Sequence, residues 1–468
     1  MVTFDALITL LNDFLWSYVL IVLLLGCALW FTVRTRFVQF RFMGEMLRLL
    51  GTAARKKEGK SISSFQAFAV SVATRVGTGN LAGVAVAITV GGPGAVFWMW
   101  IVALLGASSA FVESTLAQVY KIRGKDSFIG GPAYYMEKGL KKRWMGILFA
   151  VLITVTFGLS FNSVQSNTIC AALYETFDIS PLYIGLALTG LTFLLIFGGV
   201  QRIAMFSSIV VPIMAIGYLL LALFVVAINI EELPAVLKLI VSNAMGWEQA
   251  IGGGVGAALM QGVKRGLFSN EAGMGSAPNA AATADISHPV MQGLIQSLGV
   301  FTDTLLICTC TAFIILFSGV PLDGSMDGIL LTQAALTNEV GSMGGTLVAV
   351  AIFLFAFSSI LGNYYYGEAN IRFITPHKAP LFIYRLAVGG MVFWGSVVSM
   401  QSVWNVADLT MGLMTLCNLV ALILLSKQAF VLLDDYRHQK KAGIKNPVFH
   451  KEQLGERASD IECWTEED

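Results

Sequence analysis

The chain has 468 residues, of which 56% are hydrophobic and only 13% are charged, and its mean hydropathy is +0.74. Soluble domains carry about 25% charged residues, so this composition excludes a soluble fold and predicts a polytopic membrane protein. The formal net charge of +1 indicates no nucleic-acid partner. The six cysteines fall mostly in apolar segments, where we expect small core residues and no disulfide framework.

The N-terminal region, residues 1–63, is expected to contain three parts. Residues 2–15 predict a short amphipathic interfacial helix, and residues 17–33 predict a first membrane span. Residues 34–60 form a strongly basic stretch, which the positive-inside rule places in the cytoplasm. The N-terminus is therefore expected outside the membrane.

Ten further apolar segments alternate between connections that carry Lys and Arg and connections that lack them. They are expected at residues 64–90, 95–120, 144–173, 182–199, 203–229, 250–285, 290–319, 345–374, 381–400 and 404–426. Residues 64–229 would hold five spans, and residues 230–426 would hold five more after an external connection. Residues 427–468 are expected to be a polar cytoplasmic tail. The predicted fold is all-α, with about eleven transmembrane helices.

Two of these spans have polar, glycine-rich centres. Residues 76–83 carry three glycines, a threonine and an asparagine, and residues 273–276 read GMGS inside the sixth of the ten spans. Because glycine is a poor helix former, both segments predict broken helices. Half-helix N-termini suit a carboxylate, and unwound carbonyls suit a small cation. Close helix packing is the alternative role for these glycines, but paired breaks in the first and sixth core spans favour a transport site.

At these residues the chain resembles a known family. VGTGNLAGVAVAITVGGPGAVFWMW at Val76–Trp100 and GLFSNEAGMGSAPNAAA at Gly266–Ala282 are similar to motifs of the alanine or glycine:cation symporter family, the sodium:alanine symporters. The resemblance implies the leucine-transporter-type fold of the amino acid–polyamine–organocation superfamily. That fold has a 5+5 inverted-repeat core with broken first and sixth helices, here behind one extra helix. It also implies coupling to sodium, sometimes to protons, and small amino-acid substrates.

The resemblance further implies roles for single residues at the substrate site. Backbone at Thr78 and Gly79 would hold the substrate carboxylate, and Phe268 would cover the substrate. Residues Phe268, Ser269 and Gly273 resemble the unwound part of the sixth core helix. On the third core helix, Phe161 and Gln165 are four apart and share one face, so they either line the pocket or serve interhelical hydrogen bonding.

Two sodium sites follow from the same resemblance. The Asn80 side chain and Ser269 would face one sodium ion, and backbone carbonyls of Ala73 and Val76 would face a second. The hydroxyls of Ser358 and Ser359 on the eighth core helix would complete the second site. Hard cations prefer oxygen ligands, so carbonyls and hydroxyls fit this role. The alternative for the serine pair is helix packing or bonding to the preceding turn.

Arg75 stands directly before the first break, near the expected midplane. A buried arginine there is costly and needs an acidic partner. Glu113, Glu271 and Asp303 are the intramembrane candidates, with Glu271 preferred because it lies in the other broken helix. The pair is either structural or part of ion coupling, with the guanidinium in the space of a cation. Lys264 and Arg265 are expected to be gate charges, or to extend towards water.

These features predict a secondary active symporter that imports a small neutral amino acid, alanine or glycine first, with sodium as coupling ion. Alternatives are a proton-coupled transporter of the same fold and, from other classes, a passive channel or an intramembrane enzyme.

No HExxH, Walker A or GxSxG motif occurs, and all four histidines lie in loops or the tail, so we expect no enzyme and no cofactor. The expected partners are the amino acid, Na⁺ or H⁺, and the lipid bilayer of a bacterial or archaeal plasma membrane, with the C-terminus cytoplasmic.

Overall fold

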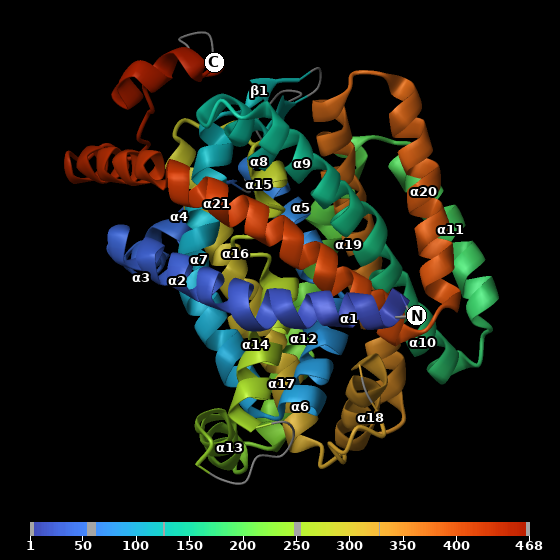
Figure 1. Cartoon of the computed structure of the whole chain (residues 1–468). Helices are drawn as coiled ribbons and strands as arrows, with labels where there is room; N and C mark the ends of the chain where they lie inside the picture. The colour runs from blue at the N-terminus through green and yellow to red at the C-terminus, as the bar shows by residue number, and fades with distance from the viewer. Residues whose placement is uncertain (1–3, 54–61, 125–126, 248–253, 327, 465–468) are drawn as a thin grey trace.

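The computed structural model describes residues 4–53, 62–124, 127–247, 254–326 and 328–464, and these are almost entirely helical (Figure 1). In a bilayer every backbone N–H and C=O needs a partner within the chain, and a helix provides one for each. Within the described residues, the strands are limited to β1 (Ile122–Arg123) and β2 (Phe128–Ile129), an antiparallel pair.

Eight helical segments are long and apolar enough to cross a membrane. They are α1–η1–α2 (Phe4–Phe14, Leu15–Leu20, Ile21–Arg34), α7 (Gly94–Val119), α9–η4–α10 (Arg143–Ile153, Thr154–Phe161, Asn162–Phe177), α12 (Val200–Ile228), α16–η5–α17 (Pro289–Val300, Phe301–Cys308, Thr309–Phe317), α19 (Met343–Ile374), α20 (Lys378–Val397) and α21 (Met400–Lys441). Together with the shorter α11 (Pro181–Ile196) and two interrupted helices, they account for eleven spans in the described residues. The predicted fold class is confirmed.

The N-terminal segment differs from its prediction in one respect. Residues 2–15 were predicted as a separate interfacial helix, but α1 continues through η1 into α2 as a single apolar segment. This segment packs across α21 (Figure 1), and Asn12 Nδ2 donates to Asn405 O at 2.9 Å. The amphipathic pattern was real, but its buried face meets another helix of the protein.

The first interrupted helix consists of α5 (Ser64–Arg75), η2 (Gly79–Gly83) and α6 (Val84–Gly91). A capping box starts it: Gln66 N donates to Ser63 Oγ at 3.1 Å, and Ser63 N donates to Gln66 Oε1 at 3.0 Å. The interruption is short, because the non-helical residues are Val76 and Gly77. The π-helical stretch η2 follows at once, which extends the irregular backbone over most of the predicted break.

The second interrupted helix consists of α14 (Gly254–Asn270) and α15 (Ala277–Ala281), with residues 271–276 between them. Gly273 and Gly275 have φ of +85° and +88°, which only glycine adopts readily, so the GMGS motif sets this turn. Glu271 also has a positive φ of 57°, which is rare for a residue with a side chain. Gly252 and Gly253, also expected to be part of this span, lie outside the described residues.

Further helices occupy segments that were expected to be loops. They are α3 (Val38–Arg41) and α4 (Met43–Ala53) in the basic stretch, α8 (Pro132–Tyr134) with η3 (Tyr135–Gly139), α13 (Leu233–Met245) and α18 (Gly328–Val340). The last two are short and lie at one end of the molecule (Figure 1). Their length is below what a span requires, so they leave the count of spans unchanged.

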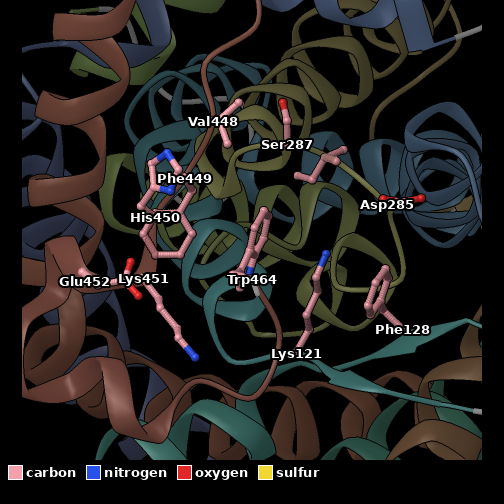
Figure 2. A pocket seen from close by; sticks show the side chains of 11 residues that line it. Lys121, Phe128, Asp285, Ser287, Val448, Phe449, His450, Lys451, Glu452 and Trp464 are labelled. Carbon is pink, nitrogen blue, oxygen red and sulfur yellow. The ribbon is translucent and has the colours of Figure 1, made fainter. Parts of the chain in front are cut away.

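The C-terminal region is folded onto the protein within the described residues. Helix α21 continues to Lys441 and so runs beyond the predicted end of the last span at residue 426; η6 (Lys451–Asp460) follows. Phe449 N donates to Ser287 O at 2.9 Å, and Trp464 Nε1 donates to Gln118 O at 3.0 Å. Figure 2 shows Lys121 between the rings of Phe128 and Trp464, beside a cleft of about 650 Å³. The predicted polar tail therefore packs against the ends of α7 and α16.

Candidate substrate and cation site

The two interrupted helices approach each other at Gly79 of η2. Their contact is with Phe268 and Ser269, which lie in the last turn of α14 and not in an unwound segment as expected. A Cβ added to Gly79 would lie 3.0 Å from Phe268 Cδ1 and 3.0 Å from Ser269 Cα, so the backbones approach too closely for a side chain. Gly83, one turn further along η2, has room, because its nearest atoms would be 3.7 Å away. Gly79 therefore allows the close approach of the two broken helices, which lies within the predicted substrate site.

Asp303 of η5 joins both interrupted helices. Asn80 Nδ2 donates to its Oδ1 at 2.7 Å, and Ser269 Oγ donates to its Oδ2 at 2.8 Å. Thr304 Oγ1 also donates to Oδ2, at 2.9 Å, and the Asp303 side chain is buried. We call these four side chains the Asp303 cluster. Sequence reasoning missed this role, because it considered Asp303 only as a partner for Arg75.

The Asp303 cluster has the chemistry of a site for a small hard cation. It holds a buried carboxylate, two hydroxyls and an amide, which together are oxygen-rich ligands. Among the described residues, no Lys or Arg nitrogen lies within ion-pair distance of Asp303. The Arg75 guanidinium attracts the Asp303 carboxylate only from beyond ion-pair distance, so a bound cation would supply the direct counter-charge that a buried carboxylate needs.

The second predicted cation site is formed by Ala73, Val76 and Ser359. Ser359 Oγ donates to Ala73 O at 2.8 Å and lies 3.4 Å from Val76 O. We call this group the Ser359 site. Ser358 is not part of it: its hydroxyl donates to Phe355 O at 2.9 Å and faces Met214 on α12. Ser359 Oγ also lies 3.0 Å from Phe355 O in the preceding turn. Because successive helical residues are rotated by about 100°, only Ser359 also reaches the carbonyls of Ala73 and Val76.

This difference between the two serines gives a test. We expect Ser359→Ala to raise the sodium concentration for half-maximal uptake about fivefold or more, because one oxygen ligand is lost. Ser358→Ala is the matched control, and we expect it to leave the sodium requirement unchanged. The measurement is initial uptake of radiolabelled alanine against sodium concentration. An equal effect of the two changes would remove Ser359 from the cation site.

Gln165 contacts the first break from α10. Thr78 N donates to Gln165 Oε1 at 3.1 Å, while Thr78 Oγ1 is buried and has no hydrogen-bond partner among the described residues. A substrate carboxylate at Thr78 N–H would replace the Gln165 oxygen. The structure thus brings Thr78, Gly79 and Gln165 together, and Gln165 makes an interhelical hydrogen bond at the predicted pocket.

Three aromatic rings line one side of this region. The ring centroids of Phe161 and Phe268 are 4.5 Å apart, and those of Phe268 and Trp404 are 4.7 Å apart. Trp404 belongs to α21 and was missed, because nothing in its sequence surroundings places it beside the sixth core helix. The ring of Phe161, which was expected on the third core helix, thus contacts Phe268 on the sixth.

The backbone of Gly273, which was expected at the substrate site, is hydrogen-bonded to other parts of the protein. Its N–H donates to Glu113 Oε1 at 3.2 Å, and Gly275 N donates to Glu113 Oε2 at 3.0 Å. Asn418 Nδ2 donates to the carbonyl of Gly273 at 2.9 Å and to Glu113 Oε2 at 3.0 Å. These bonds satisfy the backbone of the second break from α7 and α21. The N–H and C=O of Gly273 are therefore both paired within the protein, with Glu113 and Asn418.

Arg75 does not contact the acidic partner that the sequence led us to expect. The guanidinium is buried, and Nη1 donates to Gln296 O at 3.2 Å. Among the described residues no carboxylate forms an ion pair with it, so the expected Arg75–Glu271 pair is not formed. Glu271 instead accepts a hydrogen bond from Ser276 Oγ at 2.5 Å. The positive φ of Glu271 turns its side chain towards its own break.

Arg265 and Lys264 lie on α14, the half of the second interrupted helix on the side opposite to the basic loops. Arg265 forms an ion pair with Asp408 of α21, and Lys264 Nζ is 4.0 Å from the same carboxylate. Both cations are largely buried, so neither extends to water. The Arg265 guanidinium lies 4.6 Å from the ring centroid of Trp404. These groups cover the aromatic rings, as gate charges would.

Two interrupted helices that meet at buried polar groups, within eleven spans, define a multi-pass membrane transporter. A sequence model described as the sodium:alanine symporter family matches residues 1–451. The chain belongs to this family of sodium-coupled amino-acid symporters, which are transporters and not enzymes.

Relatives over nearly the full length agree with this assignment. The chain is 56% identical to the probable sodium/glutamine symporter GlnT of Bacillus subtilis, over 98% of this chain and 96% of that protein. It is 54% identical to the amino-acid carrier protein AlsT of Bacillus subtilis, over 99% and 98%. It is 37% identical to the sodium/alanine symporter AgcS of Methanococcus maripaludis, over 90% and 95%.

A solved structure shares the fold. A mutant form of the manganese transporter of Eremococcus coleocola superposes with a TM-score of 0.53 and 17% sequence identity. The match covers 82% of this chain and 81% of that chain. At this identity the likeness concerns the fold alone.

Proposed function

We propose that the protein imports a small neutral amino acid, alanine or glycine first, together with sodium ions, by alternating access across a bacterial or archaeal plasma membrane. The N-terminus would lie outside and the C-terminus in the cytoplasm, as the distribution of Lys and Arg indicates. The substrate carboxylate would bind backbone at Thr78 and Gly79, between the two breaks. Sodium would bind at the Asp303 cluster and at the Ser359 site.

The observation that supports this proposal most is the Asp303 cluster. Its hydrogen bonds connect Asn80 of η2 with Ser269 of α14, and so one interrupted helix with the other, through one buried carboxylate. A cation bound there would hold both breaks in the geometry that receives the substrate. Sodium would thereby stabilise the substrate-competent state more than the other states, which is the condition for coupling.

The substrate range is expected to be narrow. The rings of Phe161, Phe268 and Trp404 are in contact, so a large side chain would have to separate them. We expect excess unlabelled alanine and glycine to reduce alanine uptake by about tenfold, while tryptophan and arginine leave it unchanged. Strong inhibition by tryptophan or arginine would contradict this pocket.

Glutamine is a second candidate substrate, because a relative that is 56% identical is named a probable sodium/glutamine symporter. The same competition experiment separates the two candidates. Inhibition by glutamine at a concentration well below that needed for alanine would make glutamine the preferred substrate.

Coupling is tested with purified protein in proteoliposomes. Radiolabelled alanine uptake is compared under an inward sodium gradient, an inward proton gradient and no gradient. We expect accumulation above the external concentration with sodium only. Accumulation with the proton gradient alone would support the proton-coupled alternative, and equilibration without accumulation would indicate a passive channel.

A further inference from the structure

Trp16 lies in η1 of the additional N-terminal segment, and its side chain points into the protein. Its side chain is fully buried, and Nε1 donates to Asp408 O on α21 at 3.2 Å. Tyr18, two residues later in the same π-helical stretch, is 74% exposed. A helix that only anchors the chain in lipid would not need an indole placed against the backbone of a core helix.

The N-terminal segment also contacts α21 closely one turn before and one turn after Asp408. Asn12 Nδ2 donates to Asn405 O at 2.9 Å, one turn before Asp408. One turn after Asp408, a Cβ on Gly412 would lie 2.6 Å from Leu15 Cδ2 and 2.8 Å from Leu20 Cδ1. Gly412 therefore permits the N-terminal segment to lie directly on α21, with Trp16 at the centre of the contact.

Trp16 also lies next to the cations that pair with Asp408. Lys264 Nζ is 5.4 Å from the Trp16 ring centroid and 4.0 Å from Asp408 Oδ2. Arg265 forms the direct ion pair with the same carboxylate. One indole thus contacts α21 through its N–H and faces α14 through its ring, where a cation–π interaction adds attraction.

Ring contacts link the Arg265–Asp408 ion pair to the predicted substrate site. The Arg265 guanidinium lies 4.6 Å from the Trp404 centroid, and Trp404 lies 4.7 Å from Phe268. Phe268 in turn lies beside Gly79, where the two interrupted helices approach each other. If α21 moved away from α14 at Asp408, this aromatic side of the site would open.

We propose that Trp16 is a positioning residue of the outer gate formed by Arg265 and Asp408. It holds α21 against α14 and so favours the state in which the site is closed on the side opposite to the basic loops. This role rests on the proposed alternating-access function. The additional N-terminal helix is then a part of the gate, and not only a membrane anchor.

The test uses the native thiol of Cys308 as a reporter. Cys308 Sγ is buried, 3.3 Å from Asn80 Nδ2 and 3.2 Å from Ser269 Oγ, so it reacts with an external reagent only when the site is open. The other five cysteines are replaced by alanine. A charged, membrane-impermeant methanethiosulfonate is added outside intact cells without sodium, and the rate of Cys308 modification is measured.

We expect Trp16→Ala to raise this rate about tenfold, because loss of the hydrogen bond and the ring shifts the population towards the outward-open state. Trp16→Phe retains a ring but no N–H, and we expect a smaller rise of about threefold. Tyr18→Ala, the matched control on the same stretch, should not change the rate. In an Asp408→Asn background the Arg265 ion pair that closes the gate is already lost, so Trp16→Ala, which acts on the same gate through the Asp408 backbone, should add little.

Rates for Trp16→Ala and Trp16→Phe equal to that of Tyr18→Ala would overturn the proposal, as would a full tenfold effect of Trp16→Ala in the Asp408→Asn background. Thermal unfolding of each purified variant shows whether it folds. If Trp16→Ala does not fold, Trp16→Phe alone decides. The labelling needs no transport, so absence of uptake in the unchanged protein would contradict the proposed function without affecting this comparison.

Discussion

Gly79→Val is expected to abolish amino-acid binding. A Cβ at Gly79 would already lie 3.0 Å from the backbone of Ser269, and valine adds two further methyl groups. The two breaks would have to separate, and the N–H groups expected to receive the carboxylate would move with them. The measurement is the thermal stability of purified protein in sodium, with and without alanine. A ligand at about a hundredfold excess over its Kd stabilises the folded state by roughly 2.7 kcal/mol, and we expect none of this in the variant.

Gly79→Val is also expected to change stability. The sequence leaves ligand binding and close packing as alternative roles for this glycine, but Gly79 does serve close packing, since the broken helices approach each other at the predicted site. We therefore also expect a lower melting temperature. Gly79→Ala and Gly83→Ala form a matched pair, and only the first should weaken alanine binding. Full alanine-induced stabilisation in Gly79→Val would exclude Gly79 from the substrate site.

Asp303→Asn is expected to raise the sodium requirement for alanine binding by about tenfold or more. The change keeps the size of the side chain but removes the negative charge from the Asp303 cluster, where low dielectric strengthens attraction to a cation. Asn80 and Ser269 donate to the two carboxylate oxygens, and an amide would offer only one acceptor. The measurement is alanine-induced thermal stabilisation as a function of sodium concentration.

The control for Asp303 is the same substitution at Asp323, which is exposed. Asp323→Asn removes one charge from the protein outside the Asp303 cluster, so it should leave the sodium requirement unchanged. An unaltered sodium dependence in folded Asp303→Asn would show that the cluster is not a sodium site.

Much of the fold could be predicted from the sequence, because it depends on local patterns. The number of spans follows from apolar length and charged loops, and the two breaks follow from glycines that allow irregular backbone. The expected separation of residues 2–15 from the first span was not found, since the sequence between Phe14 and Ile21 contains no proline or glycine that would end the helix. The helices α13 and α18 were missed because they are too short for a span.

The site was predictable only where residues are close in sequence or on one helix. Thr78 and Gly79 stand at the break itself, and the carbonyls of Ala73 and Val76 follow from it. Asp303, however, meets Asn80 across 223 residues, and no local pattern indicates that contact. The same holds for Trp16 and Asp408, which are 392 residues apart. Ser358 and Ser359 are neighbours in sequence, but only the helix rotation decides which one faces Ala73.

Sodium and the amino acid are proposed to bind at one joint site between the two interrupted helices. The most direct test of this proposal is the affinity of purified protein for alanine at increasing sodium, together with its affinity for sodium at increasing alanine, both by calorimetry. Coupling through a shared site requires the two ligands to strengthen each other by the same factor, and we expect about tenfold or more, equivalent to roughly 1.4 kcal/mol. An alanine affinity that is equal in sodium and in choline would contradict the account.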